Sequence, residues 1–143
     1  MWRFKARKAT EQLSFASIWK AGYNWKTRGP DSGQYFDAQT WEDDEHAVTI
    51  GTEDSDKLFL RAENDGWLPQ RFLLKPRYDY DNLAVQYLQE GMTVHLGEVL
   101  PEEKFQIYFG IAWQLQGASD HAYTSIAADF ALEGIINSAN ELR

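Results

Sequence analysis

The sequence predicts an α+β protein in which a mainly antiparallel β-sheet packs against a long C-terminal helix. Residues 104–114 alternate apolar and polar side chains as a strand does, and residues 120–139 carry apolar side chains at helical spacing. Because the strand patterns precede the helical one, strands and helix are expected to segregate. The length of 143 residues fits a single globular domain over residues 1–143.

The first 39 residues predict a short N-terminal helix followed by a loop. Thr10 is a suitable N-cap, and apolar residues recur at helical spacing as far as Gly22. The same stretch also alternates apolar and polar residues, so a strand stays open as the alternative. Residues 23–39 are rich in Gly, Asn, Asp and Pro, which favours a loop.

The next segment predicts a hairpin and a further strand. Residues 47–52 and 57–63 lean toward β-structure and would pair across the acidic tip at residues 53–56. Residues 67–74 follow a turn and predict another strand, bent or placed at a sheet edge by Pro69.

The clearest β pattern lies in residues 92–114. Residues 92–100 alternate in places, residues 101–103 predict a turn, and residues 104–114 return as a second strand. In the returning strand five apolar side chains fall on one face: Phe105, Ile107, Phe109, Ile111 and Trp113. Such a face predicts a central strand packed on the core.

The C-terminal segment predicts the long helix. Ser119 or Asp120 is a suitable N-cap. Apolar residues then form two neighbouring stripes: Tyr123, Ile126, Ala127 and Phe130, followed by Leu132, Ile135, Ile136 and Ala139. Gly134 lies in the middle of this helix and weakens it by about 1 kcal/mol relative to alanine.

Negative charge is concentrated in residues 31–65, which carry eleven carboxylates against two cations in a chain of net charge −8. Such a segment either keeps the surface solvated or attracts a basic protein. The acidity opposes binding to a phosphate backbone, so no nucleic-acid partner is expected. Residues 1–30 are basic and are more readily matched by the acidic segment of the same chain.

Several other classes of protein are disfavoured. The sequence has no cysteine, which removes disulfides and thiolate chemistry. It shows neither a secretory signal in residues 1–10 nor an apolar run long enough to span a membrane. A cytoplasmic protein without a membrane partner is therefore expected.

Motifs for metal binding or catalysis are lacking. The run Glu42–His46 offers carboxylates and an imidazole, but four consecutive acids do not converge on one ion and no EF-hand loop follows. Asp79 and Asp81 form an acidic pair that more often belongs to a turn. No serine stands in a nucleophile-elbow pattern, and no glycine-rich phosphate loop is present. The sequence predicts no enzyme, metal or cofactor.

Aromatic residues are abundant, with six Trp, seven Tyr and eight Phe. Some fit the core by periodicity, whereas Trp41 and Trp67 neighbour polar loop residues. Trp and Tyr are enriched at binding hot spots because they bury a large area with few rotatable bonds. Bulk filling of a small β-rich core is the alternative explanation.

In its small size, acidity, lack of Cys, loop-associated Trp and strand–turn–strand over residues 92–114, the chain resembles bacterial immunity proteins of contact-dependent and other polymorphic toxin systems. The resemblance is one of general character and implies binding and neutralisation of a cognate toxin domain, such as a nuclease. The residues expected to contact this basic partner are Trp41, Glu42, Asp43, Asp44, Glu45, Glu53, Asp54, Asp56 and Trp67. The alternatives are a small-ligand or carbohydrate-binding domain that uses aromatic side chains, and a homodimeric scaffold subunit.

Overall fold

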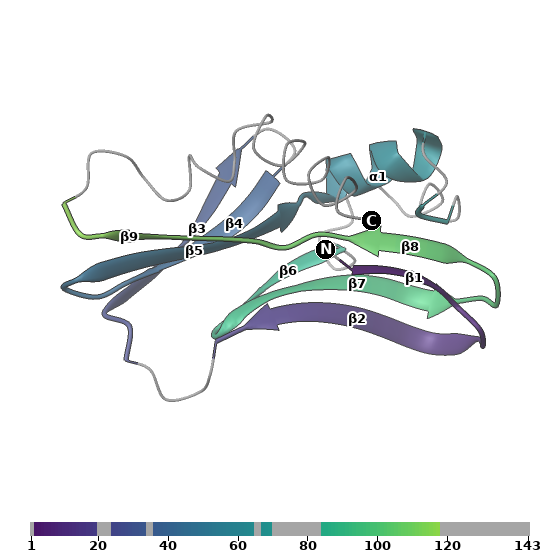
Figure 1. The fold of residues 1–143 in the computed structure, drawn as a ribbon, viewed down its shortest axis with the longest axis horizontal. Coiled ribbons are helices and arrows are strands. Elements are labelled where there is room, and N and C mark those ends of the chain that lie inside the picture. The colour runs from purple at the N-terminus through teal and green to yellow at the C-terminus, as the bar shows by residue number, and fades with distance from the viewer. Residues whose placement is uncertain (1, 20–23, 34–35, 65–66, 70–83, 118–143) are drawn as a thin grey trace, which may run out of the picture.

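Nine β-strands and one short helix make up the described part of the chain in this computed structural model, residues 2–19, 24–33, 36–64, 67–69 and 84–117 (Figure 1). All strand pairs are antiparallel. The only helix among these residues is α1, Ser55–Asn64. The predicted α+β class was therefore wrong, and the protein is mainly antiparallel β. The expected C-terminal helix falls within residues 118–143, which lie outside the described residues.

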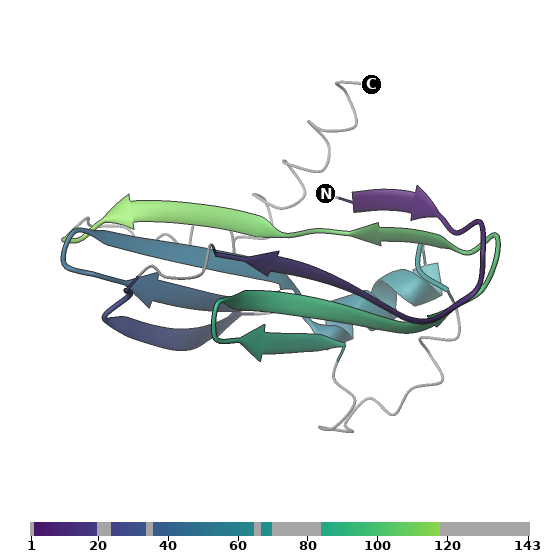
Figure 2. The same cartoon turned by 90° about the horizontal axis from the view of Figure 1, so that it is seen from below.

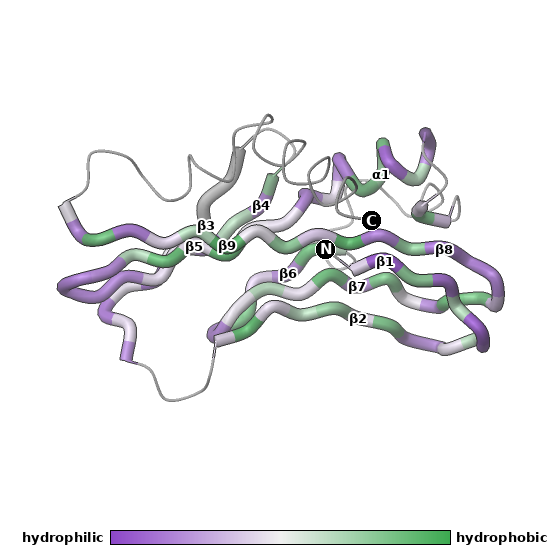
Figure 3. The backbone as a smooth tube through the Cα atoms, in the orientation of Figure 1, coloured by the Kyte–Doolittle hydropathy of each residue, from purple (hydrophilic) through white to green (hydrophobic). Residues whose placement is uncertain are grey.

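The strands form three small sheets. The first pairs β1 (Trp2–Lys5) with β8 (Lys104–Ile107). The second has the order β2 (Thr10–Ile18), β7 (Gly91–Val99), β6 (Val85–Leu88). The third has the order β3 (Thr27–Gly33), β4 (Phe36–Glu42), β5 (His46–Glu53), β9 (Gly110–Leu115). Hydrophobic and hydrophilic residues alternate along many of these strands (Figure 3), as expected of sheets with unlike faces.

One hydrophobic core joins the sheets to the helix. Its largest fully buried side chains are Trp41 and Ile50 from the third sheet, Met92, Val94 and Leu96 from β7, Phe105 and Ile107 from β8, Leu58 from α1, and Leu68. The ring of Phe4 on β1 stacks on Phe105 with centroids 5.0 Å apart. Because every sheet contributes to this cluster, the burial of apolar area holds the three sheets together.

Helix α1 replaces the second strand of the predicted hairpin. Asp54 caps it, since its carboxylate accepts a hydrogen bond from the backbone N–H of Lys57 at 2.7 Å. Leu58 and Ala62, four residues apart, are buried on one face. This helical spacing, together with the cap, outweighs the weak β-leaning composition of residues 57–63. Within the described residues, no helix has the length and apolar character needed to cross a membrane.

Two leading predictions for the N-terminal third were also wrong. The helix expected from Thr10 is strand β2, which is the alternative that the alternation had left open; its side chains alternate between exposed and half-buried from Gln12 to Ile18. The expected loop over residues 23–39 holds β3 and much of β4. Gly and Pro are tolerated in β3 because it lies at a sheet edge.

Strand β5, strand β7 and the turn after it are confirmed, since residues 47–52, 92–99 and 101–102 adopt the predicted structures. The strand expected over residues 67–74 is not seen in residues 67–69, and residues 70–74 lie outside the described residues.

The predicted central strand over residues 104–114 is interrupted. Tyr108 and Phe109 are not in a strand, and they separate β8 in the first sheet from β9 in the third (Figure 1). Phe105 and Ile107 are fully buried as expected, but Ile111 is 57% and Trp113 70% exposed. The prediction of one central strand with its apolar face on the core was therefore wrong. Both faces of β8 are buried from Phe105 onward, and in β9 the apolar side chains are the exposed ones.

Candidate docking surface

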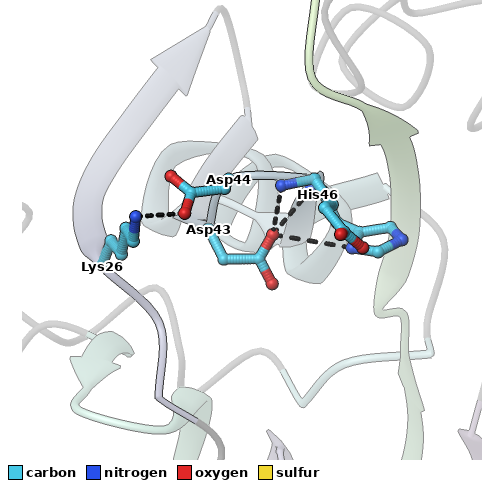
Figure 4. A network of polar contacts seen from close by, with 5 residues as sticks. Lys26, Asp43, Asp44 and His46 are labelled. Atoms are coloured by element: carbon cyan, nitrogen blue, oxygen red, sulfur yellow. Dashed lines mark hydrogen bonds and ion pairs between the residues drawn. The ribbon is translucent and has the colours of Figure 1, made fainter.

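The acidic turn, Asp43–Glu45, connects β4 to β5 and is shaped by its own first carboxylate. The Oδ1 atom of Asp43 accepts hydrogen bonds from the backbone N–H groups of Glu45 at 2.8 Å and of His46 at 2.7 Å (Figure 4). The backbone N–H of Asp43 in turn donates to the carbonyl oxygen of His46 at 3.0 Å. Asp43 is therefore a turn-forming residue, half-buried against the backbone it organises.

Asp44 and Glu45, by contrast, are exposed at the tip of this turn. Lys26 forms an ion pair with Asp44 (Figure 4), and both side chains are more than half exposed. Exposed ion pairs contribute little stability and exchange readily with solvent or with another cation. Glu42, at the base of the turn, is half-buried and accepts a hydrogen bond from the Thr27 hydroxyl at 3.1 Å. The turn thus presents two carboxylates outward on a rigid base.

The second group of acidic residues, 53–56, was expected at the tip of a hairpin. In the structure its carboxylates lie in different environments. Glu53 is 1% exposed, and its Oε1 atom lies 2.8 Å from Nε of Arg61 in a buried ion pair. Asp54 caps α1, and Asp56 stands exposed in the first turn of that helix. The prediction that Glu53 contacts a partner is corrected, because its side chain is almost fully buried.

The prediction that Trp41 contacts a partner is corrected as well, because Trp41 is also buried. Its side chain is 1% exposed, its indole N–H donates to the carbonyl oxygen of Gln89 at 3.2 Å, and its ring meets that of Trp19 edge-on. Trp67 is half-buried, and the guanidinium carbon of Arg3 lies 3.5 Å from the centroid of its ring. One face of this ring already holds a cation from the same chain, so Trp67 is a poor receptor for a second one.

An apolar surface that the sequence assigned to the core lies beside the acidic turn. We define the β9 stripe as Ile111, Trp113 and Leu115, whose side chains are 57%, 70% and 59% exposed. The registers place Trp113 opposite Val48 and Val48 opposite Trp41, so the stripe lies on the same sheet face as the buried Trp41. This face contacts the β6–β7 turn through Trp41, yet it is exposed at β9.

The β9 stripe and the acidic turn are contiguous. Leu115 is the register partner of His46, and the backbone N–H of Gln116 donates to the carbonyl oxygen of Glu45 at 2.8 Å. Exposed apolar side chains and exposed carboxylates therefore meet at one end of the third sheet. Sequence reasoning expected this combination of groups but assigned the aromatic part to Trp41 and Trp67 instead of Trp113.

A second polar arrangement crosses the exposed face of the second sheet. The hydroxyl of Ser14 lies 2.6 Å from Nδ1 of His95, whose Nε2 lies 3.1 Å from Oε1 of Gln86. The order hydroxyl, imidazole and orienting oxygen resembles a nucleophile with its base. Its third member is a neutral amide, which lacks the charge with which a carboxylate stabilises an imidazolium. The arrangement is best understood as a cross-strand hydrogen-bond chain.

Among the described residues, no group of three or more His, Cys, Asp or Glu side chains lies close enough together to hold a metal ion. Comparison with protein-family models, with curated proteins and with solved structures finds no match for this chain.

Proposed function

We propose that this protein is an inhibitory, immunity-type protein that binds and neutralises a basic protein, with a cognate bacterial toxin domain such as a nuclease as the leading candidate. The observation that carries the proposal is the contiguity of the acidic turn with the β9 stripe. Hot spots combine large, rigid apolar side chains with charged groups at their rim. Trp113, at 70% exposure, is the natural anchor of such a site.

Electrostatics supports a cationic partner. The chain carries a net charge of −8, and the turn that exposes Asp44 and Glu45 adjoins Leu115 at the end of the β9 stripe. Complementary charge accelerates encounter and rejects partners of like charge, while the apolar anchor slows dissociation. An inhibitor built this way would cover a basic, substrate-binding cleft, as a nuclease requires.

The proposal is tested with the toxin domain whose gene adjoins the gene of this protein. Co-production is expected to protect cells from that domain, and the purified pair is expected to form a one-to-one complex. The variant Trp113→Ala should weaken binding by about 30-fold, which corresponds to about 2 kcal/mol for a hot-spot residue. Trp2→Ala is the matched control, because Trp2 is 57% exposed on a different sheet. A neighbourhood without any toxic product, or equal effects of both variants, would contradict the proposal.

Carbohydrate binding is the second candidate, and the exposed ring of Trp113 favours it because indole faces stack on sugars. The two candidates differ in their response to salt. Capture of a basic protein should weaken as ionic strength rises, whereas thermal stabilisation by a neutral oligosaccharide should be insensitive to salt.

A further inference from the structure

Strand β9 forms one edge of the third sheet as far as the described residues extend. In the described part of the chain it pairs with β5 on one side only (Figure 2). Its six residues, Gly-Ile-Ala-Trp-Gln-Leu, include no charged residue and no proline. Native proteins normally protect such edges with lysine, proline or a bulge, because unpaired N–H and C=O groups template a further strand.

The opposite edge of the same sheet shows this protection. Strand β3 contains Arg28, Gly29, Pro30 and Asp31 within seven residues. Pro30 has no backbone N–H to donate, and charged residues at an edge disfavour the approach of another strand. One edge of the third sheet is thus blocked by its sequence, and at the other edge no further strand pairs with β9 among the residues that the structure describes.

The outward-pointing backbone N–H and C=O groups of β9 belong to the same residues whose side chains are exposed. Gln116 donates its N–H toward Glu45, on the β5 side. Backbone groups alternate in direction along a strand, so Gln114 and Ala112 also point toward β5. The N–H and C=O groups of Ile111, Trp113 and Leu115 therefore point away from the sheet, at this edge.

We infer that β9 accepts an extended segment of the partner as a fifth, antiparallel strand of the third sheet. This inference rests on the proposed function and specifies how the partner is held. An antiparallel segment would lay its N-terminal residues beside Leu115 and the acidic turn. The segment should therefore begin with Lys or Arg, which meet Asp44 and Glu45, and continue with alternate apolar residues over the β9 stripe.

A second copy of this chain is the weaker occupant. Neither β9 nor the residues that flank it from Tyr108 to Gly117 include a Lys or Arg, so a paired copy would offer hydrogen bonds without a cation for Glu45. Two chains that each carry a net charge of −8 also repel one another. The negative charge of the acidic turn therefore favours a basic strand over a second copy of this chain.

The decisive measurement is amide hydrogen exchange of the full chain, alone and with the toxin domain defined above. Strand addition should slow exchange of the Ile111, Trp113 and Leu115 amides at least tenfold and leave those of β3 unchanged. A complex that leaves these three amides unprotected would overturn the inference while the proposed function stands. Failure of the toxin domain to bind at all would overturn the proposed function. Protection that grows with protein concentration and without any partner would show self-pairing and overturn the inference.

Two capped peptides and a pair of variants refine the test. A Lys-Arg-Val-Thr-Val-Thr-Val peptide should protect β9, and a peptide in which Glu-Glu replaces Lys-Arg should not. Ile111→Pro removes an outward N–H together with the side chain, whereas Ile111→Thr keeps the N–H and a β-branched side chain. Binding of the basic peptide should fall about tenfold further for the proline variant. Equal affinity of both peptides or of both variants would overturn the inference, and the exchange experiment on the unaltered chain remains decisive if the proline variant fails to fold.

Discussion

Asp54 lies between strand β5 and helix α1, which it caps, and burial changes the pKa of its carboxyl group. Burial raises the pKa of the Asp54 carboxyl above its ordinary value, the hydrogen bond from Lys57 lowers it in part, and the negative charge of Asp37 raises it further. Burial likewise raises the pKa of Asp37, against the hydrogen bond that Tyr87 donates. Both groups hold their protons more tightly in the folded state than in the unfolded chain.

The sign of the pH effect follows from linkage. Where the folded pKa is raised, the folded state binds more protons, so stability rises as pH falls through the folded pKa toward the ordinary value of 3.8. Asp54→Asn keeps an effective cap without the buried charge and should be at least as stable as the unaltered protein at pH 7. This difference should shrink in acid. Asp54→Ala should lose about 1 kcal/mol because the cap is gone.

Urea denaturation at pH 7 and pH 4 measures both effects. Glu98→Gln removes the same charge from an exposed position on β7 and serves as the control. A loss of stability at pH 7 as large in Asp54→Asn as in Asp54→Ala would show that the charge itself, and not the cap geometry, is required.

Gly91 allows strands β2 and β7 to approach one another closely. A Cβ built on Gly91 would lie 2.0 Å from the carbonyl oxygen of Ser17, a backbone atom that cannot move aside. Gly91→Ala should therefore destabilise the protein by about 1–3 kcal/mol, as overpacking does. Gly29→Ala is the control, since nothing lies within 4 Å of the Cβ position there. Thermal denaturation compares the two, and equal melting temperatures would contradict the geometry.

At the scale of elements, two acidic segments with similar sequences have different roles. Residues 53–56 join a strand to a helix, so one carboxylate is buried against Arg61, one caps α1 and one is exposed. Residues 43–45 form a tight turn, so Asp44 and Glu45 face solvent. The second segment therefore exposes two adjacent carboxylates to a partner, whereas the first exposes Asp56 alone.

The paired variant Asp44→Asn with Glu45→Gln tests whether these two carboxylates steer a partner. It should leave the fold intact because Asp43, which organises the turn, is retained. Association with the toxin domain at low salt should slow by about tenfold, with little change in the dissociation rate. Stopped-flow measurements over a range of salt concentrations would report both rates.

The control for that experiment removes the same charge elsewhere. Glu11→Gln with Glu98→Gln neutralises two exposed carboxylates on β2 and β7, away from the third sheet. If both paired variants slowed association equally, net charge alone would account for the effect and the acidic turn would have no special role.

For the whole molecule, local pattern located some strands and misjudged others. Strands β5 and β7 lie where β-leaning and partly alternating residues predicted them, whereas the clearest alternation, in residues 104–114, is divided between two sheets. Strand β2 was expected to be a helix because its apolar spacing fits both periods. Strand β3 was missed because Gly29 and Pro30 are typical of loops, and an edge strand tolerates them where a central strand does not.

For the candidate site, the sequence indicated the types of side chain but did not identify all of the residues. Charge and aromatic content indicated a surface that pairs carboxylates with bulky rings, and Asp44 and Glu45 were among the residues named for it. The sequence placed Trp41 at this surface and Trp113 in the core, and the structure reverses the two. Both residues lie in strands, and burial depends on whether another layer covers that part of the sheet.

The sequence alone determined the acidity of the chain, the absence of cysteine, and the periods of its clearest strands, because these depend on composition and on neighbouring residues. Tertiary structure decided which carboxylates face water, and it divided residues 104–114 between two sheets. It also left β9 at an edge. Such outcomes depend on which strands pair over long separations and on what packs above them, and that information is carried by the whole set of contacts and not by any one segment.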